Sequence, residues 1–489
     1  MEAVQSIVAP ELLDASPHEE FEYGKTALRP DEIRILILRS EFYEEDESDV
    51  HCHLVRLDLN ATKTLSRKRH PFMALSYVWG AEEPKKKIYI NGKHKHVSPN
   101  LHNALIHLRE KMAPVPLWVD ALCINQQDTL ETSREVLKMK RIYAQCWSVL
   151  YWLGPAMDPD LDDFYYGQDD IPAHAVHMQE IGEVYETLRE RGDNESEKII
   201  DVWRSVTRVK QIDSLKRLAT YLALLFSLPF WRRVWITQEF ILSRDGFFVW
   251  GKYTFNVRAL DALLHPQARL LPYTPYSVDF HRYIKAYSMA LETIRMRSYN
   301  ARFLDALLNV RYRLAGREHD YIYGLLGFTN VRGGIIPDYS KTKRQVFTEA
   351  MQAVLAQETN LDILSACDRG WAKCSATDST TDDQDWPTWL PDWSYAPLKI
   401  YQEWRFDVRS LLLDFQDHLP VHFNAGANTR QAAYVLPGGR HLCVRGIGFD
   451  SVAEIISGTG VRWEYKVKAL WYAGKFRRAY TTLGSKLFL

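Results

Sequence analysis

Short apolar runs alternate with amphipathic stretches along the first third of the chain. Residues 117–122 are apolar apart from Asp120, as expected of a strand that is buried on both faces of a parallel sheet. Asp128, with Glu131 three residues later, predicts a capping box that opens a helix. A second apolar run covers residues 148–153. A strand, a helix and a strand with short joints predict a crossover unit, whose strand ends face the crevice where open α/β sheets bind ligands.

An earlier segment repeats this pattern. Residues 72–79 have the composition of another buried strand. Asn91-Gly92, between alternating residues, predicts a type I′ hairpin, and Ser98-Pro99 predicts the first residues of a helix. The order of strand, hairpin, helix, strand, helix and strand predicts an α/β fold with a sheet that is parallel at its centre.

The remaining chain divides by composition. An acidic, aromatic loop and two amphipathic stretches predict a helical insertion over about residues 158–228. Beyond residue 256 the pattern is mainly helical, with short strands near residues 434 and 441. We therefore expect a tail over residues 1–30, an α/β domain over residues 31–255, and a mainly helical C-terminal unit over residues 256–489.

Composition excludes several classes of protein. The chain has 489 residues, of which 46% are hydrophobic and 25% charged, which is typical of a globular protein with more than one packed unit. The net charge of −1 gives no basic field for nucleic acid or for an acidic membrane. The six cysteines form no CxxC pair, and no stretch is typical of a secretory signal or a membrane span. We expect a cytoplasmic protein without nucleic-acid or membrane partners.

Several motifs carry a family resemblance. They read ALSYVWG from Ala74, LWVDALCINQQDTLE from Leu117, VLYWLG from Val149 and WRRVWITQE from Trp231. In this order and spacing they resemble the fungal heterokaryon-incompatibility (HET) domain, and segments near residues 320–340 and 386–394 resemble the region that follows it. Many HET proteins continue through a Gly-rich β segment after the point where this chain ends, so we expect the C-terminal unit to be incomplete.

The resemblance implies a function. HET proteins act in non-self recognition between fungal cells, where an activated domain triggers cell death. The HET domain is remotely similar to Toll/interleukin-1 receptor (TIR) domains, which implies a TIR-like, flavodoxin-like sheet. Some TIR domains hydrolyse NAD, and others only assemble with one another. Ser76-Tyr77 is similar to the end of the first TIR strand, and Trp235 to Glu239 is similar to the segment in which the catalytic Glu follows a Trp by four residues.

The chemistry of NAD cleavage fits these residue types. The transition state carries an oxocarbenium-like ribose, which one ionised carboxylate stabilises, and an aromatic wall stacks the cationic nicotinamide. Glu239 is the predicted catalytic carboxylate, and Trp235 shares its face if the segment is helical. NAD, or a related nucleotide, would be the substrate, and no cofactor is expected. The other residues predicted to line the crevice are Ser76, Tyr77, Trp79, Asp120 and Asn125.

Structural alternatives stand beside each of these roles. An ordinary salt bridge to a nearby arginine (Arg232, Arg233 or Arg244) explains Glu239 equally well. The two Trp residues fit a core, Asp120 fits a structural role beside the next loop, and Asn125 fits an amide that braces that loop. His51-Cys52-His53 places two His side chains on one strand face, but without further ligands no metal site is expected.

Two other functions remain open from the sequence. One is a non-catalytic module that signals by self-assembly into a homo-oligomer on activation, with a non-self recognition protein as partner. The other is a sensor that binds a nucleotide without cleaving it.

Overall fold

The computed structural model describes residues 19–40, 49–61, 70–155, 225–257, 301–358 and 386–394, with short gaps inside these ranges, and a few shorter stretches including 433–435 and 442–444. The chain forms two compact units. The first contains Met1–Ala301, Tyr312–Thr329 and Pro337–Ser340, and the second contains Arg302–Arg311, Asn330–Ile336 and Lys341–Leu489. The tail over residues 1–18 and the insertion over residues 158–224 lie outside the described residues.

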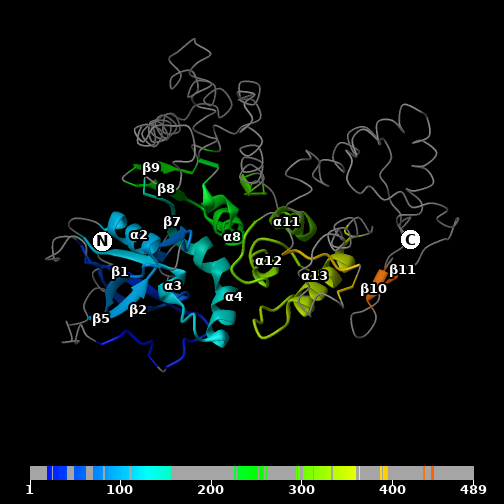
Figure 1. Ribbon diagram of the computed structural model, residues 1–489, viewed down its shortest axis with the longest axis horizontal. Helices are drawn as coiled ribbons and strands as arrows, with labels where there is room; N and C mark the ends of the chain where they lie inside the picture. Colours follow the sequence, from blue (N-terminus) through cyan, green and yellow to red (C-terminus); the bar gives the residue numbers. More distant parts are fainter. Residues whose placement is uncertain are drawn as a thin grey trace, which may run out of the picture. The chain divides into compact units, whose positions relative to one another are not determined.

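The first unit contains a nine-stranded mixed sheet with the order β5-β4-β2-β1-β6-β3-β7-β8-β9 (Figure 1). The pairs β3–β6, β3–β7, β7–β8 and β2–β4 are parallel, whereas β1–β2, β1–β6 and the edge pairs β4–β5 and β8–β9 are antiparallel. The predicted α/β class and parallel centre are therefore confirmed, and the TIR-like type stays a prediction. The strands are β1 (Glu32–Leu38), β2 (His51–Asp58), β3 (His70–Tyr77), β4 (Lys86–Ile90), β5 (Lys93–Val97), β6 (Val115–Trp118), β7 (Cys146–Gly154), β8 (Gly246–Trp250) and β9 (Tyr253–Asn256).

Strand β3 lies between β6 and β7, and its second half is buried. Its last residue, Tyr77, pairs in register with Trp152 of β7, and Ala74 pairs with Trp118, the last residue of β6. Because these strands are parallel, the chain leaves all of them at the same edge of the sheet. This edge is where the sequence predicts the functional residues.

The helices of the first unit cover this core. They are α2 (Pro99–Leu108), α3 (Asp120–Cys123), α4 (Thr129–Gln145), α8 (Val234–Leu242) and α12 (Asp320–Tyr323), together with the 3-10 helix η4 (Pro229–Arg232). Helix α4 packs against β3 and β7 and against α8, and α12 packs against α8. The predicted cap of α2 is confirmed, because the Ser98 hydroxyl accepts a hydrogen bond from the Leu101 N–H at 3.3 Å. The predicted hairpin turn is also confirmed, with positive φ at Asn91 and Gly92.

Two local predictions need correction. The strand predicted over residues 117–122 ends at Trp118, because Asp120 begins α3 and its carboxylate accepts the Ala121 N–H at 2.7 Å. The carboxylate of Asp128 caps α4 as predicted. Glu131 does not complete the capping box, because its carboxylate is bonded to Arg34 of β1 and to the loop before α4.

The second unit is described here by itself. It contains α11 (Phe303–Val310), α13 (Lys343–Gln357) and an antiparallel pair formed by β10 (Ala433–Val435) and β11 (Leu442–Val444). Thr342 and Gln345 form a reciprocal capping box at the start of α13, which confirms the predicted helix there.

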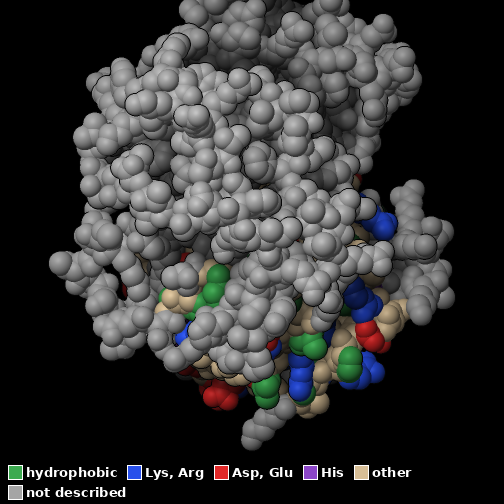
Figure 2. All heavy atoms as spheres, turned by 90° about the vertical axis from the view of Figure 1, so that its right-hand side faces the viewer, with side chains coloured by type: hydrophobic (Ala, Val, Ile, Leu, Met, Phe, Trp, Pro, Cys, Tyr) green, Lys and Arg blue, Asp and Glu red, His purple; other side chains and the backbone are tan. Residues whose placement is uncertain are grey.

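The surface of the described part mixes charges of both signs. Figure 2 shows Lys and Arg side chains beside Asp and Glu on one face. None of the helices in the described part of the chain has the length and hydrophobicity that a bilayer-spanning segment requires.

Candidate active site

The carboxyl end of β3 meets helix α8 through a buried hydrogen bond. Ser76 and Tyr77, the last residues of β3, are 1% and 2% exposed. The Ser76 hydroxyl donates a hydrogen bond to the carboxylate of Glu239, which comes from α8, 163 residues later in the chain. The structure therefore brings together the strand end and the acid that the sequence predicts as parts of one site.

Glu239 is buried among hydroxyl groups. Glu239 is 2% exposed, and the hydroxyl of the buried Tyr143 of α4, which donates a hydrogen bond to the Leu75 carbonyl at 3.4 Å, also acts to lower the pKa of the carboxyl group. Burial raises the pKa of Glu239 from 4.5 to about 7, although the Arg233 charge and the Ser76 hydrogen bond act in the opposite direction. At neutral pH the group is therefore present in both protonation states.

The structure does not contain the salt bridge between Glu239 and a nearby arginine that the sequence offers as an alternative. Within the described residues, no Lys or Arg nitrogen lies within 4.0 Å of its carboxylate. Arg233 acts on Glu239 only through its charge at longer range, and Arg232 is exposed. A buried carboxyl group without a contacting cation and with a raised pKa is a feature typical of functional sites.

Asp120 is the second carboxyl group of the cluster. It opens α3 just beyond the end of β6, and its carboxylate accepts hydrogen bonds from the Trp79 indole N–H at 3.1 Å and from the Ala121 N–H at 2.7 Å. Burial raises its pKa, whereas the Arg233 charge and these hydrogen bonds lower it. The negative charge of Asp120 in turn raises the pKa of Glu239, so the two acids are electrostatically coupled.

Trp79 is the exposed member of the cluster. It follows β3 and is 46% exposed, whereas Tyr77 and Glu239 are buried. The turn that carries it is fixed at Val78, whose carbonyl accepts a hydrogen bond from Asn100 at 2.6 Å. Gly80 closes the turn with a φ of 75°, and a Cβ there would lie 3.1 Å from that of Asn100. Trp79 is thus an aromatic ring held at the surface beside Asp120.

Asn125 lies in the loop between α3 and α4, where its contacts are within the loop. Its N–H donates to Glu131 at 2.7 Å, and its side-chain oxygen accepts the Gln127 N–H at 3.3 Å. Glu131 is in turn bonded to both terminal nitrogens of Arg34. These bonds fit the bracing role, and they do not bring Asn125 into contact with Glu239.

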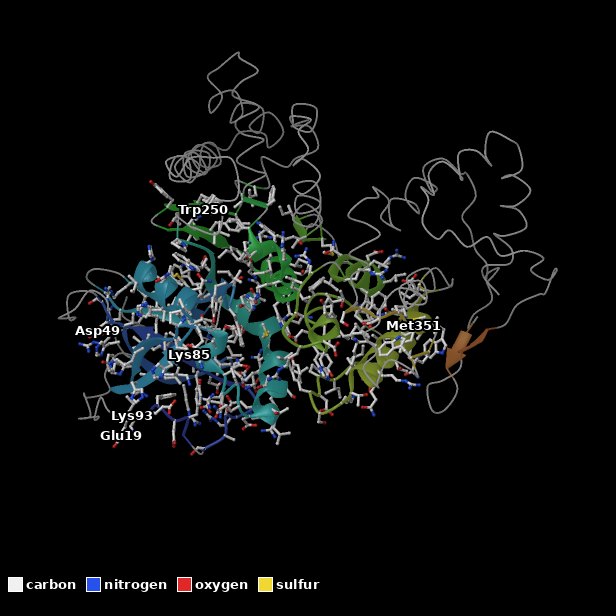
Figure 3. The ribbon with its side chains drawn as sticks, viewed as in Figure 1. Glu19, Asp49, Lys85, Lys93, Trp250 and Met351 are labelled. Carbon is white, nitrogen blue, oxygen red and sulfur yellow. The ribbon has the colours of Figure 1, made fainter. Side chains whose placement is uncertain are left out.

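An N-terminal segment holds the same loop from outside. Glu19 forms an ion pair with Lys93 of β5 at 2.7 Å, and both side chains are labelled in Figure 3. The Tyr23 hydroxyl donates toward the carbonyls of Leu122 and Ile124, at 3.0 and 3.2 Å. The position of the loop, and of Asp120 before it, is therefore fixed on several sides.

Trp235 faces a different neighbour from the one predicted for it. It lies one turn before Glu239 in α8 and is half-buried, and its indole acts on Asp320 of α12, whose pKa it lowers. A Cβ on Gly324 of α12 would lie 3.6 Å from the Trp235 ring, which places helix and ring in close contact. The structure therefore joins Trp235 to α12 and does not record a contact between it and Ser76 or Trp79.

Sequence reasoning missed two members of the cluster. Tyr143 fits the apolar stripe of α4, so its hydroxyl was not considered as a partner for an acid. Arg233 was considered only as a salt-bridge partner, whereas the structure makes it a charge that acts on both acids. No sequence pattern around Arg233 predicts this arrangement. Within the described residues no group of three or more His, Cys, Asp or Glu side chains is placed to hold a metal ion.

Comparison with known proteins adds a family context. Residues 72–239 match the model of the family described as heterokaryon incompatibility protein (HET). The chain is 27% identical over 389 residues to "Heterokaryon incompatibility protein 6, OR allele" of Neurospora crassa, a match that covers 68% of this chain and 54% of the relative. The chain thus spans about half the length of that relative. No solved structure matches the chain. The family match begins in β3 and ends at Glu239, so it includes every residue of the cluster described above.

Proposed function

We propose, from the match of residues 72–239 to the heterokaryon incompatibility (HET) family, that the chain is a cell-death effector of fungal non-self recognition that hydrolyses the nicotinamide–ribose bond of NAD. The observation that supports the reaction most directly is the buried Ser76–Glu239 hydrogen bond at the carboxyl edge of the sheet. The relative's printed name supports the biological role.

The reaction requires an ionised carboxylate that stabilises positive charge, and it does not require a proton donor. Nicotinamide leaves as a neutral pyridine when the electrons of the C1′–N bond return to its positively charged ring, so no proton has to be supplied. The ribose then carries oxocarbenium character, and an ionised carboxylate beside it offsets the developing charge. Water forms the new C1′–O bond and releases one proton, which gives ADP-ribose, nicotinamide and a proton from NAD and water.

Glu239 supplies this carboxylate in the proposal. Its raised pKa of about 7 means that the ionised form is populated at neutral pH but poorly stabilised by its surroundings. An oxocarbenium-like ribose would provide the missing positive charge, so the interaction would be stronger in the transition state than in the ground state. Ser76 orients the carboxylate through the hydrogen bond from its hydroxyl group.

Trp79 supplies the aromatic wall. Because Glu239 is 2% exposed, the ribose can reach it only when a neighbouring side chain moves. Trp79 is exposed and is bonded to Asp120 by a single hydrogen bond of 3.1 Å, so it is the neighbour best placed to move. Its ring would then stack on the nicotinamide cation, an interaction worth about 1–2 kcal/mol when desolvated.

The proposal is tested by incubating the purified chain with NAD and measuring free nicotinamide. We expect release by the wild type and a loss of about 100- to 1000-fold in kcat for Glu239→Gln, which keeps the shape of the side chain but not its charge. Glu83→Gln is the matched control, because the Glu83 side chain is 74% exposed and lies outside the cluster. Unimpaired release by Glu239→Gln would contradict the proposal. Nucleotide binding in calorimetry without any product would instead indicate a sensor.

A second candidate, signalling by self-assembly without catalysis, is favoured by one face of α4. Leu130 and Leu137 lie two turns apart on this helix and are 70% and 53% exposed. Exposed leucines at this spacing are typical of a helix face that meets a partner. Light scattering that rises with concentration, and falls in a Leu130→Glu/Leu137→Glu double variant, would support assembly. Ile336→Glu in the second unit is the control, since Ile336 is also exposed, at 67%.

A further inference from the structure

Arg233 is fixed in place by its backbone. It immediately precedes α8, and its neighbours are paired with Leu314: the Val234 N–H donates to the Leu314 carbonyl at 3.0 Å, and the Leu314 N–H donates to the Arg232 carbonyl at 2.5 Å. The Arg233 N–H itself donates to the Phe230 carbonyl at 3.4 Å. The start of the Arg233 side chain is therefore held between η4, α8 and the Leu314 segment.

The guanidinium group of Arg233 makes fewer hydrogen bonds to the protein than those of two buried arginines, Arg34 and Arg313. Arg34 bonds to Glu131 and to the Cys123 carbonyl, and Arg313 bonds to the Trp231 carbonyl and to the Thr293 hydroxyl. Arg233 is half-buried, yet its side chain has neither a hydrogen bond nor a carboxylate oxygen within 4.0 Å among the described residues. A guanidinium offers five N–H donors, so this side chain has its binding capacity free.

The charge of Arg233 nevertheless faces the acid cluster. It acts on Asp120, on Glu239 and on the hydroxyl of Tyr77, which come from three different elements. Two acids and a cation thus converge without touching one another. If the cation were only a structural counter-charge, direct ion pairing with either acid would be the more favourable arrangement.

We propose that Arg233 binds the phosphate next to the scissile ribose, so that the site selects phosphate-bearing nicotinamide nucleotides over the nucleoside. The inference rests on the proposed function for the position of the ribose at Glu239. In a nucleotide the 5′-phosphate is separated from C1′ by the width of one ribose ring. Arg233 acts on Glu239 through its charge without contacting it, as a cation bound to that phosphate would, and guanidinium groups bind phosphate oxygens in a bidentate manner.

The arrangement also explains how an anion is tolerated near two acids. Burial raises the pKa of both acids, and for Glu239 the value of about 7 means that part of its negative charge is absent near neutral pH.

The experiment compares Arg233→Gln with the wild type on NAD, nicotinamide mononucleotide and nicotinamide riboside, with nicotinamide release as the readout. We expect the KM for the two phosphate-bearing substrates to rise by about 10- to 100-fold, and the KM for the riboside to change by less than about threefold. Arg233→Lys, which keeps the charge, should recover part of the loss for the phosphate-bearing substrates. Arg232→Gln is the control, because Arg232 is adjacent and exposed. Circular dichroism and thermal melting establish that each variant is folded.

The outcomes separate this inference from the proposed hydrolysis. Equal losses on all three substrates, or no loss, would overturn the phosphate role while hydrolysis stands. If the wild type cleaves none of them, calorimetry with nicotinamide mononucleotide and the riboside takes its place. Binding of the mononucleotide that is lost in Arg233→Gln, with riboside binding unchanged, would then support the phosphate site without the hydrolysis. No binding of the mononucleotide by the wild type would overturn it.

Discussion

Glu131 and Glu239 are two largely buried glutamates that meet their surroundings in opposite ways. Both carboxylate oxygens of Glu131 are bonded to the Arg34 guanidinium, and the two side chains are 12% and 6% exposed. Glu239 accepts a hydrogen bond from the Ser76 hydroxyl and has no contacting cation among the described residues. Of the two acids, only Glu239 carries a charge that no contacting cation among the described residues compensates.

This difference distinguishes a buried acid with a structural role from one that is available for catalysis. A buried acid whose oxygens are all occupied by a cation holds chain segments together, here β1 against the loop that follows α3. A buried acid that is met by hydroxyls alone changes its protonation near neutral pH, with a pKa of about 7 for Glu239, and is available to a substrate. Four predictions test this contrast, from the largest expected effect to the smallest.

Glu131→Gln should lower the free energy of unfolding by about 3–5 kcal/mol, because it leaves the buried Arg34 charge without its partner. Urea unfolding at neutral pH measures this effect. A double variant, Arg34→Met with Glu131→Leu, should recover much of the loss, since it removes the unpaired charge. A change below about 1 kcal/mol for Glu131→Gln would mean that this pair is not structural support.

The stability of the wild type should fall as the pH rises from about 4.5 to about 7. The folded pKa of Glu239 is raised above the unfolded value of 4.5, so the fold favours the protonated form. The contribution of Glu239 to the free energy of unfolding is complete below about pH 4.5. It is lost as the pH rises through about 7, which lowers the free energy of unfolding by about 3 kcal/mol. Glu239→Gln should remove this slope, which urea unfolding near pH 5 and near pH 8 would reveal. Parallel curves for the two proteins would contradict the raised pKa.

Ser76→Ala should reduce kcat/KM by about tenfold at neutral pH, because the hydroxyl donates to the ionised carboxylate of Glu239. Without this donor the pKa of Glu239 should rise further, so activity should return partly at alkaline pH. The pH profile of nicotinamide release measures the shift. Ser148→Ala is a control from β7, outside the cluster. An unchanged pH midpoint would show that Ser76 does not act on the acid.

Trp79→Phe should change KM by less than about tenfold and leave stability within about 0.5 kcal/mol, because the residue is 46% exposed. The ring is kept, and only the indole N–H to Asp120 is lost. Trp79→Ala should give the larger rise in KM, since it removes the stacking surface. Equal KM values for the Phe and Ala variants would exclude a stacking role.

The sequence predicts the local elements of the fold well, because each depends on neighbours in the chain. The buried run of β3, the Ser98 cap and the Asn91-Gly92 turn are all decided within a few residues. The predicted end of β6 was wrong by a few residues, because the Asp120 carboxylate accepts the Ala121 N–H in the first turn of α3. The prediction that Glu131 completes a capping box was wrong, because its carboxylate is bonded to Arg34, 97 residues earlier in the chain.

The site was only partly predictable for the same reason. The family resemblance places Ser76 and Glu239 in one site, and the structure joins them. The partner of Trp235 lies in α12, well beyond the matched segment, and no pattern around Trp235 indicates it. The free guanidinium of Arg233 depends on distances between three elements, and such distances are not encoded in local spacing.

The pH profile of kcat/KM for nicotinamide release is the most direct test of the role of Glu239. If the ionised carboxylate stabilises the ribose, activity should rise with pH through about 7 and then level off, as the pKa of the buried group requires. The rise should be absent in Glu239→Gln, whose residual activity should not vary over this range. Activity that falls through about pH 7, or a profile shared by the wild type and Glu239→Gln, would contradict the account.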